Sequence, residues 1–136
     1  MGGKPILVDT HGFYVWADAE SVRHNFAREL VLRRDRHFVT TSWIVVETVN
    51  LFVAIRQAHW VEPLMDFLDT TSALQVLPAS PEHFAEAKEL WRRFREHAFP
   101  LTDCTSFVVM RELGLRDALT ADRHFRTMGF NPLLAD

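Results

Sequence analysis

The chain alternates short apolar runs with longer amphipathic stretches, and this alternation constrains its fold more than any other feature of the sequence. The longer stretches place apolar residues every three or four positions, as helices that pack on a core do. No internal repeat, Gly/Ser-rich linker or low-complexity segment interrupts the pattern. Strands that alternate with helices predict an α/β fold, with a central, mostly parallel β-sheet flanked by helices on both faces. The apolar runs predict strands at residues 6–9, 38–40, 74–77 and 118–120.

The amphipathic stretches predict helices at residues 20–34, 44–53, 63–68, 81–94, 102–113 and 123–128. The helix at 20–34 places Val22, Phe26 and Leu30 on one apolar face. The helix at 44–53 is apolar nearly all round, so we expect it to be buried.

Several helix ends are marked by capping residues. Thr41 or Ser42 is expected to cap the second helix, and Ser80 followed by Pro81 is expected to start the fourth. Gly114 stands where a helix often ends in left-handed backbone. The fourth helix is expected to turn one apolar stripe inward, formed by Phe84, Ala87, Leu90, Trp91 and Phe94.

Composition limits the class of protein. The 136 residues are 48% hydrophobic and include 11 Phe and 4 Trp, so we expect a single domain over residues 1–136 with a core that needs no crosslinks. The one cysteine, Cys104, has no partner for an internal disulfide, and no segment has the pattern of a secretory signal or membrane span. We therefore expect a cytoplasmic protein. The formal net charge of -3 argues against a diffuse basic surface for nucleic acid, so any such contact must be local.

Four acidic residues occupy positions where a carboxylate is costly or conspicuous: Asp9, Glu47, Asp103 and Asp122. Asp9 and Asp122 each follow an apolar run, at the carboxyl edge where open α/β sheets bind ligands. Asp103 stands near the start of a predicted helix, where the helix macrodipole favours a negative group. Glu47 interrupts an apolar helix, where an unpaired carboxylate would shift its pKa and become neutral.

Each of these acids also has a structural explanation. An Asp at a strand end or helix start commonly caps backbone N–H groups, and an ion pair from Arg56 would account for Glu47. However, the segments around the four acids hold no cluster of Lys or Arg that would neutralise them together, whereas a hard divalent cation binds several oxygens. Zinc is not expected, because the chain has no CxxC or HxxxH spacing. The combination favours a hard divalent cation.

Four segments of the sequence resemble the acidic blocks of the PIN-domain ribonucleases, and of their toxin subgroup above all: ILVDTHGFYVW, SWIVVETVNLF, LTDCTSFVVMRELGL and ALTADRHF. The blocks stand in family order between residues 6 and 125. The resemblance implies one PIN-like domain whose catalytic and metal-binding residues are Asp9, Glu47, Asp103 and Asp122.

The resemblance also implies roles for hydroxyl groups beside these acids. Thr10, Ser106 and Thr120 are expected to orient carboxylates, water or phosphate. Where many relatives carry a small hydroxyl after the first Asp-Thr pair, this chain has His11 and Gly12. We expect His11 either to contact RNA or to be a partly buried turn residue.

The activity implied is a metal-dependent endoribonuclease. One or two Mg²⁺ or Mn²⁺ ions would lower the pKa of an attacking water and offset charge on the scissile phosphate, leaving 5′-phosphate and 3′-hydroxyl ends. A histidine-based ribonuclease fits less well, because the seven histidines show no paired spacing. Four arginines lie close in sequence to Asp103 and Asp122: Arg111, Arg116, Arg123 and Arg126. They could contact RNA phosphates, or they could form a solvated face on two helices.

The toxin resemblance implies a homodimer and a small antitoxin protein that covers the acidic pocket. Trp16, Phe52 and Trp60 are candidates to line a groove for an antitoxin helix, although core packing is the commoner fate of such residues.

Other functions remain open at this point. The chain could be a non-catalytic PIN-fold binding module, or a PIN nuclease outside any toxin-antitoxin system. Phosphotransfer enzymes that begin with a strand-Asp fit poorly. The haloacid-dehalogenase type needs a second Asp where His11 stands, and the receiver type needs a lysine after a late strand, whereas the only lysines are Lys4 and Lys88.

Overall fold

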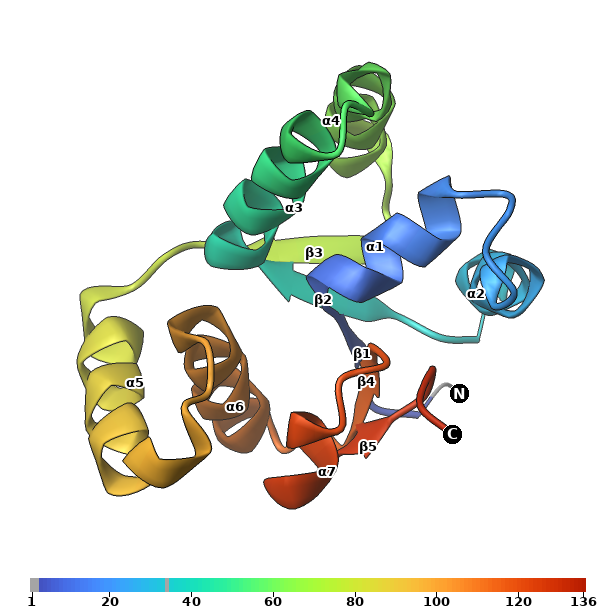
Figure 1. Cartoon of the computed structure of the whole chain (residues 1–136). Coiled ribbons are helices and arrows are strands. Elements are labelled where there is room, and N and C mark those ends of the chain that lie inside the picture. Colours follow the sequence, from blue (N-terminus) through green and yellow to red (C-terminus); the bar gives the residue numbers. More distant parts are fainter. Residues whose placement is uncertain (1–2, 34) are drawn as a thin grey trace.

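The computed structural model describes residues 3–33 and 35–136, and within them a single parallel sheet forms the centre of the fold (Figure 1). The strand order is β3-β2-β1-β4-β5, and every neighbouring pair is parallel. The strands are β1 (Ile6–Val8), β2 (Phe38–Thr41), β3 (Leu74–Leu77), β4 (Asp117–Leu119) and β5 (Asn131–Pro132). The α/β class and the parallel sheet predicted from the sequence are therefore confirmed.

Helices cover both faces of the sheet. They are α1 (Thr10–Ala17), α2 (His24–Leu32), α3 (Ser42–Ala54), α4 (Val61–Thr70), α5 (Pro81–Arg93), α6 (Leu101–Leu113) and α7 (His124–Thr127), with short 3₁₀ turns η1 (Ala58–Trp60) and η2 (Arg95–His97). Figure 1 shows α1 to α4 on one side and α5 to α7 on the other. Right-handed crossovers require this division. The chain adds β2 and β3 on one side of β1 and then returns to add β4 and β5 on the other side, so the later connections cross the opposite face of the sheet. Within the described residues, no helix is long and apolar enough to cross a membrane.

The central strands are apolar on both faces because helices cover both. Ile6, Leu7 and Val8 of β1 are all buried, as expected for a parallel strand in the middle of a sheet. The buried Thr40 hydroxyl donates a hydrogen bond of 2.8 Å to the Val8 carbonyl, so its donor is satisfied within the core.

Most predicted helix ends are confirmed. Thr41 caps α3 by accepting the Ile44 N–H, and Ser80 caps α5 by accepting the His83 N–H. Gly114 ends α6 with a φ of 67°, the left-handed conformation that favours glycine.

At the start of the chain, the sequence analysis missed one helix and gave another helix the wrong start. Helix α1 was not predicted, since residues 10–17 carry apolar side chains nearly all round and lack a clear amphipathic period. The helix predicted over 20–34 begins only at His24, and Val22 is 98% exposed while Phe26 is also exposed. Turns occupy the intervening residues, so α2 buries only Ala27 and Leu30, with Val31 partly buried beside them. Arg34, the last residue of that predicted helix, lies outside the described residues.

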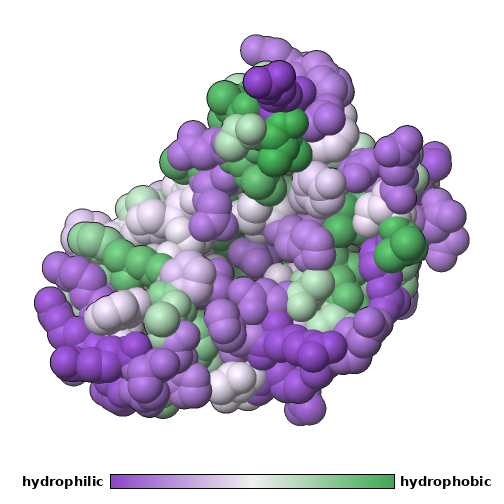
Figure 2. All heavy atoms as spheres, viewed as in Figure 1, coloured by the Kyte–Doolittle hydropathy of each residue, from purple (hydrophilic) through white to green (hydrophobic). Residues whose placement is uncertain are grey.

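Burial of α3 and α5 was overestimated. In α3, Val46 and Val53 are more than half exposed, and in α5, Phe84 and Trp91 are exposed as well. Both helices pack through one face only. Helix α3 is apolar nearly all round, so part of its apolar surface stays exposed, and the apolar stripe of α5 is wider than the face that packs on the core. Figure 2 shows such residues over the α3–α4 end at the top and over the α5–α6 pair on the left.

For Phe52, burial was underestimated, because the sequence analysis considered it as a candidate to line a surface groove. Phe52 is buried, and its ring packs edge-on against Trp60 at 5.2 Å between centroids. Trp16 and Trp60 are partly buried against the same core. The edge strand β5 was also missed, because two residues that include a proline give no strand pattern.

Helix α1 approaches β4 very closely at Gly12. A Cβ placed on Gly12 would lie 2.3 Å from the backbone oxygen of Leu119. The same Leu119 oxygen accepts the Asp9 N–H at 3.4 Å, just before α1 begins. The missing side chain at Gly12 therefore lets α1 lie against the end of β4, and Asp9 stays beside that strand.

We expect Gly12→Ala to destabilise the protein by about 1–3 kcal/mol, the usual cost of overpacking, although Ala is ordinarily the better helix former. The measurement is the free energy of unfolding in denaturant. Gly3→Ala is the control, because a Cβ at Gly3 would meet nothing within 4 Å. An unchanged or raised stability of Gly12→Ala would show that α1 does not depend on this close approach.

Candidate metal centre

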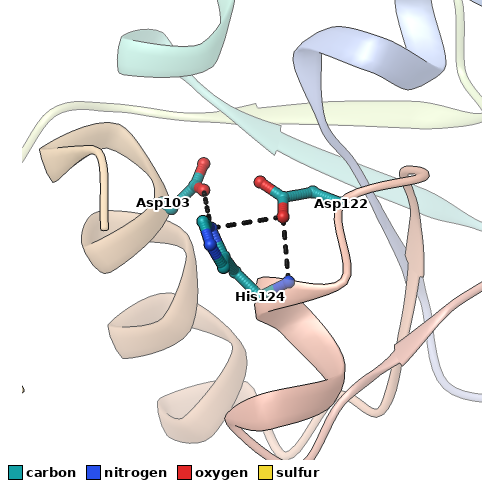
Figure 3. A group of neighbouring side chains, drawn as sticks. All are labelled: Asp103, Asp122 and His124. Atoms are coloured by element: carbon teal, nitrogen blue, oxygen red, sulfur yellow. Dashed lines mark hydrogen bonds and ion pairs between the residues drawn. The ribbon is translucent and has the colours of Figure 1, made fainter. Parts of the chain in front are cut away.

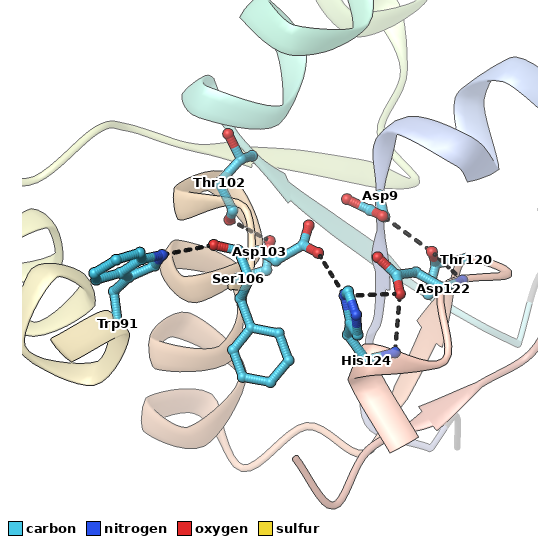
Figure 4. Close-up of polar contacts among 9 residues, drawn as sticks. Asp9, Trp91, Thr102, Asp103, Ser106, Thr120, Asp122 and His124 are labelled. Carbon is cyan, nitrogen blue, oxygen red and sulfur yellow. Dashed lines mark hydrogen bonds and ion pairs between the residues drawn. The ribbon is translucent and has the colours of Figure 1, made fainter. Parts of the chain in front are cut away.

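Three of the four predicted acids meet at the carboxyl edge of the sheet. Asp9 directly follows β1, Asp122 follows β4, and Asp103 lies in the first turn of α6. The strands β1 and β4 are parallel neighbours, with Val8 opposite Leu119, so their carboxyl ends lie side by side. Figure 4 shows the three carboxyl groups turned toward a common space.

Asp9 is held by a neighbouring hydroxyl. Thr120 donates a hydrogen bond of 3.0 Å to Asp9 Oδ2, and the same Thr120 oxygen accepts the Asp122 N–H at 3.1 Å. The predicted role of Thr120 in orienting a carboxylate is thus consistent with its contacts. The other oxygen of Asp9, Oδ1, is buried and has no hydrogen-bond partner.

Burial and neighbouring charge raise the pKa values of Asp9 and Asp103. Burial raises the pKa of Asp9 from 3.8 to about 6, and the charges of Glu47 and Asp122 add to the rise, against the lowering effect of the Thr120 hydrogen bond. Burial also raises the pKa of Asp103 well above its ordinary value, followed by the negative charge of Asp9 and by the carboxyl group of Asp122. A cation placed between these groups would reverse both shifts.

His124 joins the acids, although the sequence analysis did not select it. Its Nδ1 lies 3.3 Å from Asp122 Oδ1 and 4.0 Å from Asp103 Oδ2 (Figure 3). One possible ligand atom from each of these three residues lies within 4.8 Å of the others. The only sequence signal was its place two residues after Asp122 in ALTADRHF, at the start of the short helix α7.

Glu47 stands slightly apart from this group. Its Oε1 accepts a hydrogen bond from the Thr10 hydroxyl, which in turn accepts one from Thr48. Its charge nevertheless contributes to the raised pKa of both Asp9 and Asp103, so Glu47 lies near both of them. Among residues 3–33 and 35–136, no ion pair to Glu47 is found, from Arg56 or from any other basic residue.

Two other predicted neighbours differ in their contacts. The Ser106 hydroxyl donates to the Thr102 carbonyl within α6 at 3.3 Å, so its predicted role in orienting a carboxylate is not supported by its geometry. The exposed His11 lies in the first turn of α1, and its Nδ1 accepts the Ala121 N–H at 3.2 Å. The protein atoms that cover part of the ring still desolvate it and lower the pKa of His11, against the opposing charge of Asp122, and the lower pKa favours the neutral form that this hydrogen bond requires.

The four arginines considered as phosphate contacts are spread widely. Arg111 lies eight residues after Asp103 along α6, about 12 Å at the helical rise. Arg116 precedes β4, whereas the acids lie beyond its other end. Arg126 contacts the Asp136 carbonyl at 3.3 Å. Only Arg123, exposed and directly after Asp122, adjoins the acidic edge in sequence and in the fold.

The donor set fits a hard divalent cation. Such ions bind carboxylate oxygens, and here one oxygen each of Asp9 and Asp103 is buried without a hydrogen-bond partner. A structural role as helix cap would use these oxygens on backbone N–H groups. Unpartnered buried carboxyl oxygens that face one another are costly, and a bound cation removes that cost.

The raised pKa of Asp9 makes stability depend on pH. The unfolded residue loses its proton near pH 3.8, and the folded one near pH 6, so the folded state holds more protons between these values. The free energy of unfolding therefore falls as pH rises through this window. Asp9→Asn removes the effect, so in chelator it should exceed wild type by on the order of 3 kcal/mol above pH 6 and by little near pH 4.

Thermal and denaturant unfolding in EDTA across this pH range measures that difference. Asp69→Asn, a change at an exposed acid of α4, is the matched control and should show no such pH dependence. Free Mn²⁺ at about one hundred times its dissociation constant should then add roughly 2.7 kcal/mol to wild type and less to Asp9→Asn. A pH-independent difference between Asp9→Asn and wild type would contradict the electrostatic account of the site.

Comparison with known proteins gives one consistent result. The family model of the PIN domain matches residues 6–131. The 23S rRNA-specific endonuclease VapC20 of Mycobacterium tuberculosis, from strains CDC 1551 / Oshkosh and H37Rv, is 26% identical over 125 residues, which cover 92% of this chain and 95% of VapC20. The crystal structure of Mycobacterium tuberculosis VapC20, a Sarcin-Ricin loop cleaving toxin, matches with a TM-score of 0.80 at 26% identity and the same coverage. Since the family model spans nearly all of the sequence and the acids meet at one edge of the sheet, this chain belongs to the PIN-domain family.

Proposed function

We propose that this protein is an endoribonuclease that hydrolyses RNA phosphodiester bonds with Mg²⁺ or Mn²⁺. The metal-binding and catalytic residues in this proposal are Asp9, Glu47, Asp103 and Asp122. The observation that carries it is the pair of buried, unpartnered oxygens of Asp9 and Asp103 at the carboxyl edge of a PIN domain. A divalent cation bound there lowers the pKa of water and offsets charge on a phosphate.

Each protein group has a part in this chemistry. Asp9, fixed by Thr120, and Asp103, fixed in the first turn of α6, supply the buried oxygens. Asp122 Oδ1 accepts the His124 N–H at 2.9 Å, so the start of α7 orients its carboxylate. Asp9 and Glu47 both lie outside the closest group of possible ligand atoms, which Asp103, Asp122 and His124 form, and Glu47 is fixed by Thr10. We assign Glu47 to a contact with the cation through a bound water molecule, which would donate a hydrogen bond to the Glu47 carboxylate.

The relatives indicate which class of RNA to test first. VapC20 acts on 23S rRNA, and its cleavage of the sarcin-ricin loop makes structured ribosomal RNA the first substrate to test for this chain. Because the net charge is -3, binding must depend on local cations, and Arg123 beside Asp122 is our candidate for a phosphate contact.

We further propose that the protein is the toxin of a toxin-antitoxin pair, acts in the cytoplasm and forms a homodimer. The likeness to VapC20 supports the toxin role. A small antitoxin would need an apolar surface, and exposed apolar side chains occur on α3 and α5. A non-catalytic binding module is the alternative, yet binding alone would not require carboxyl groups kept together at an energetic cost.

Asp9→Asn and Asp103→Asn should each abolish cleavage of ribosomal RNA while the fold is retained. Each change removes a negative oxygen ligand from a cation that both are proposed to hold. The measurement is cleavage of labelled RNA with Mn²⁺, with the fold checked by circular dichroism and the product ends mapped. Wild type should leave 5′-phosphate ends and should be inactive in excess EDTA.

Asp69→Asn is the control and should cleave as wild type does, since Asp69 is an exposed residue of α4. Cleavage by wild type in excess EDTA, or cyclic-phosphate ends, would refute the metal mechanism. Transfer RNA and messenger RNA in parallel reactions identify the substrate class. Absence of cleavage of all three RNAs by wild type with Mn²⁺ would favour the binding-module alternative.

Production of the protein alone should arrest growth of its bacterial host, because cleavage of ribosomal RNA stops translation. Colony counts after induction measure this effect, and Asp103→Asn produced at the same level should be harmless. Light scattering on the purified protein tests the homodimer. Normal growth with active enzyme present would place the protein outside toxin-antitoxin systems.

A further inference from the structure

His124 contributes a nitrogen atom to a site whose other candidate ligands are oxygens. Its Nδ1 is buried and makes no hydrogen bond, although 43% of the side-chain surface is exposed. The nearest polar atoms are Asp122 Oδ1 at 3.3 Å and Asp103 Oδ2 at 4.0 Å, and the latter is also buried and unpartnered. Two unpartnered atoms that face each other at this distance leave room for an ion that both could bind.

The orientation of the ring is set by its surroundings. The His124 ring packs edge-on against Phe99, with centroids 5.0 Å apart, and Phe99 is itself buried. At the backbone, the His124 N–H donates to Asp122 Oδ1, so residue 124 is attached to the same carboxylate that its ring faces. Figure 4 shows the ring between Asp103 and Asp122. This arrangement turns Nδ1 into the site before any ion arrives, which reduces the cost of ordering a ligand.

His11 provides a comparison within the same site. Its Nδ1 already accepts the Ala121 N–H, so the lone pair of that atom is in use. The two histidines therefore differ in what Nδ1 can do, and only His124 has Nδ1 free among the carboxyl oxygens.

We propose that His124 Nδ1 is a direct ligand of the divalent cation, together with Asp103 and Asp122, and that it gives the site a preference for Mn²⁺ over Mg²⁺. This inference rests on the proposed function, since it concerns the same cation. Both ions favour oxygen ligands, but Mn²⁺ is a transition metal and accepts an imidazole nitrogen more readily than Mg²⁺, so one nitrogen among carboxylates shifts the balance toward Mn²⁺.

A different explanation of the geometry is an ion pair in which protonated His124 takes the place of a cation beside Asp122. A protonated imidazole has no lone pair to offer a metal. In that case, His124 would oppose metal binding and would never contact the ion. The two explanations thus differ in whether nitrogen and metal are bonded.

Pulsed electron paramagnetic resonance of the Mn²⁺-loaded protein tests the bond directly. We expect a ¹⁴N modulation in wild type that changes to the ¹⁵N pattern when histidine is labelled with ¹⁵N. His124→Asn should lose the nitrogen signal and still bind Mn²⁺, because the Asn carbonyl oxygen stands close to where Nδ1 was. His59→Asn, a change at an exposed histidine of η1, is the control and should keep the signal.

Calorimetric titration of the same proteins with Mn²⁺ and Mg²⁺ gives the preference. We expect His124→Asn to weaken Mn²⁺ binding at least about tenfold, the scale seen when groups that support a metal ligand are removed, and to weaken Mg²⁺ binding by a smaller factor. Three results would overturn the assignment to His124: no ¹⁴N signal in wild type, a ¹⁴N signal that persists in His124→Asn, or a ¹⁴N signal that disappears in His11→Asn. If Mn²⁺ binds in an Asp103-dependent way without nitrogen coupling, the inference alone fails. If no Mn²⁺ binds, the proposed function fails with it.

Discussion

Three acidic side chains, Asp9, Asp103 and Asp122, meet where β1 and β4 end, and the rest of this structure depends on holding them there. Their mutual repulsion and their loss of contact with water both oppose this arrangement. Asp9 and Asp103 are buried beside each other and beside Asp122, and their pKa values rise because burial and like charge favour the protonated forms. An arrangement of this kind lowers stability unless a cation binds, so it is explained by function and not by folding. The proposed nuclease activity gives these groups a use that a structural role does not.

The surrounding fold keeps these groups together against their repulsion. Gly12 lets α1 lie against the end of β4, and Thr120 ties Asp9 to the loop that carries Asp122. Phe99 positions the His124 ring on the other side. None of these contacts supplies a positive charge to the centre. The scaffold therefore fixes the geometry of the site but not its charge balance, and the proposed cation would link occupancy of the site to stability.

Much of the fold and part of the site could be predicted from the sequence. The predictions that agree with the structure depend on local signals, which need no knowledge of distant contacts. They are the apolar strand runs, the helix caps Thr41 and Ser80, and the helix end at Gly114. Helix α1 could not be found by periodicity, because its residues are apolar on nearly all sides. The acids at strand ends were visible since parallel strands end at one edge, whereas the contribution of His124 depends on how Phe99 and α7 orient its ring, which no spacing encodes. Ser106 shows the converse, since a hydroxyl near the acids in sequence donates within its own helix.

The most direct test of this account is to locate Mn²⁺ by anomalous diffraction from crystals of the wild-type protein soaked in the ion. The account predicts an anomalous peak enclosed by Asp9, Asp103 and Asp122, with carboxylate oxygens at coordinating distance, about 2.0–2.6 Å for hard divalent cations. A map with no peak there at saturating Mn²⁺, or with peaks only elsewhere on the surface, would contradict it.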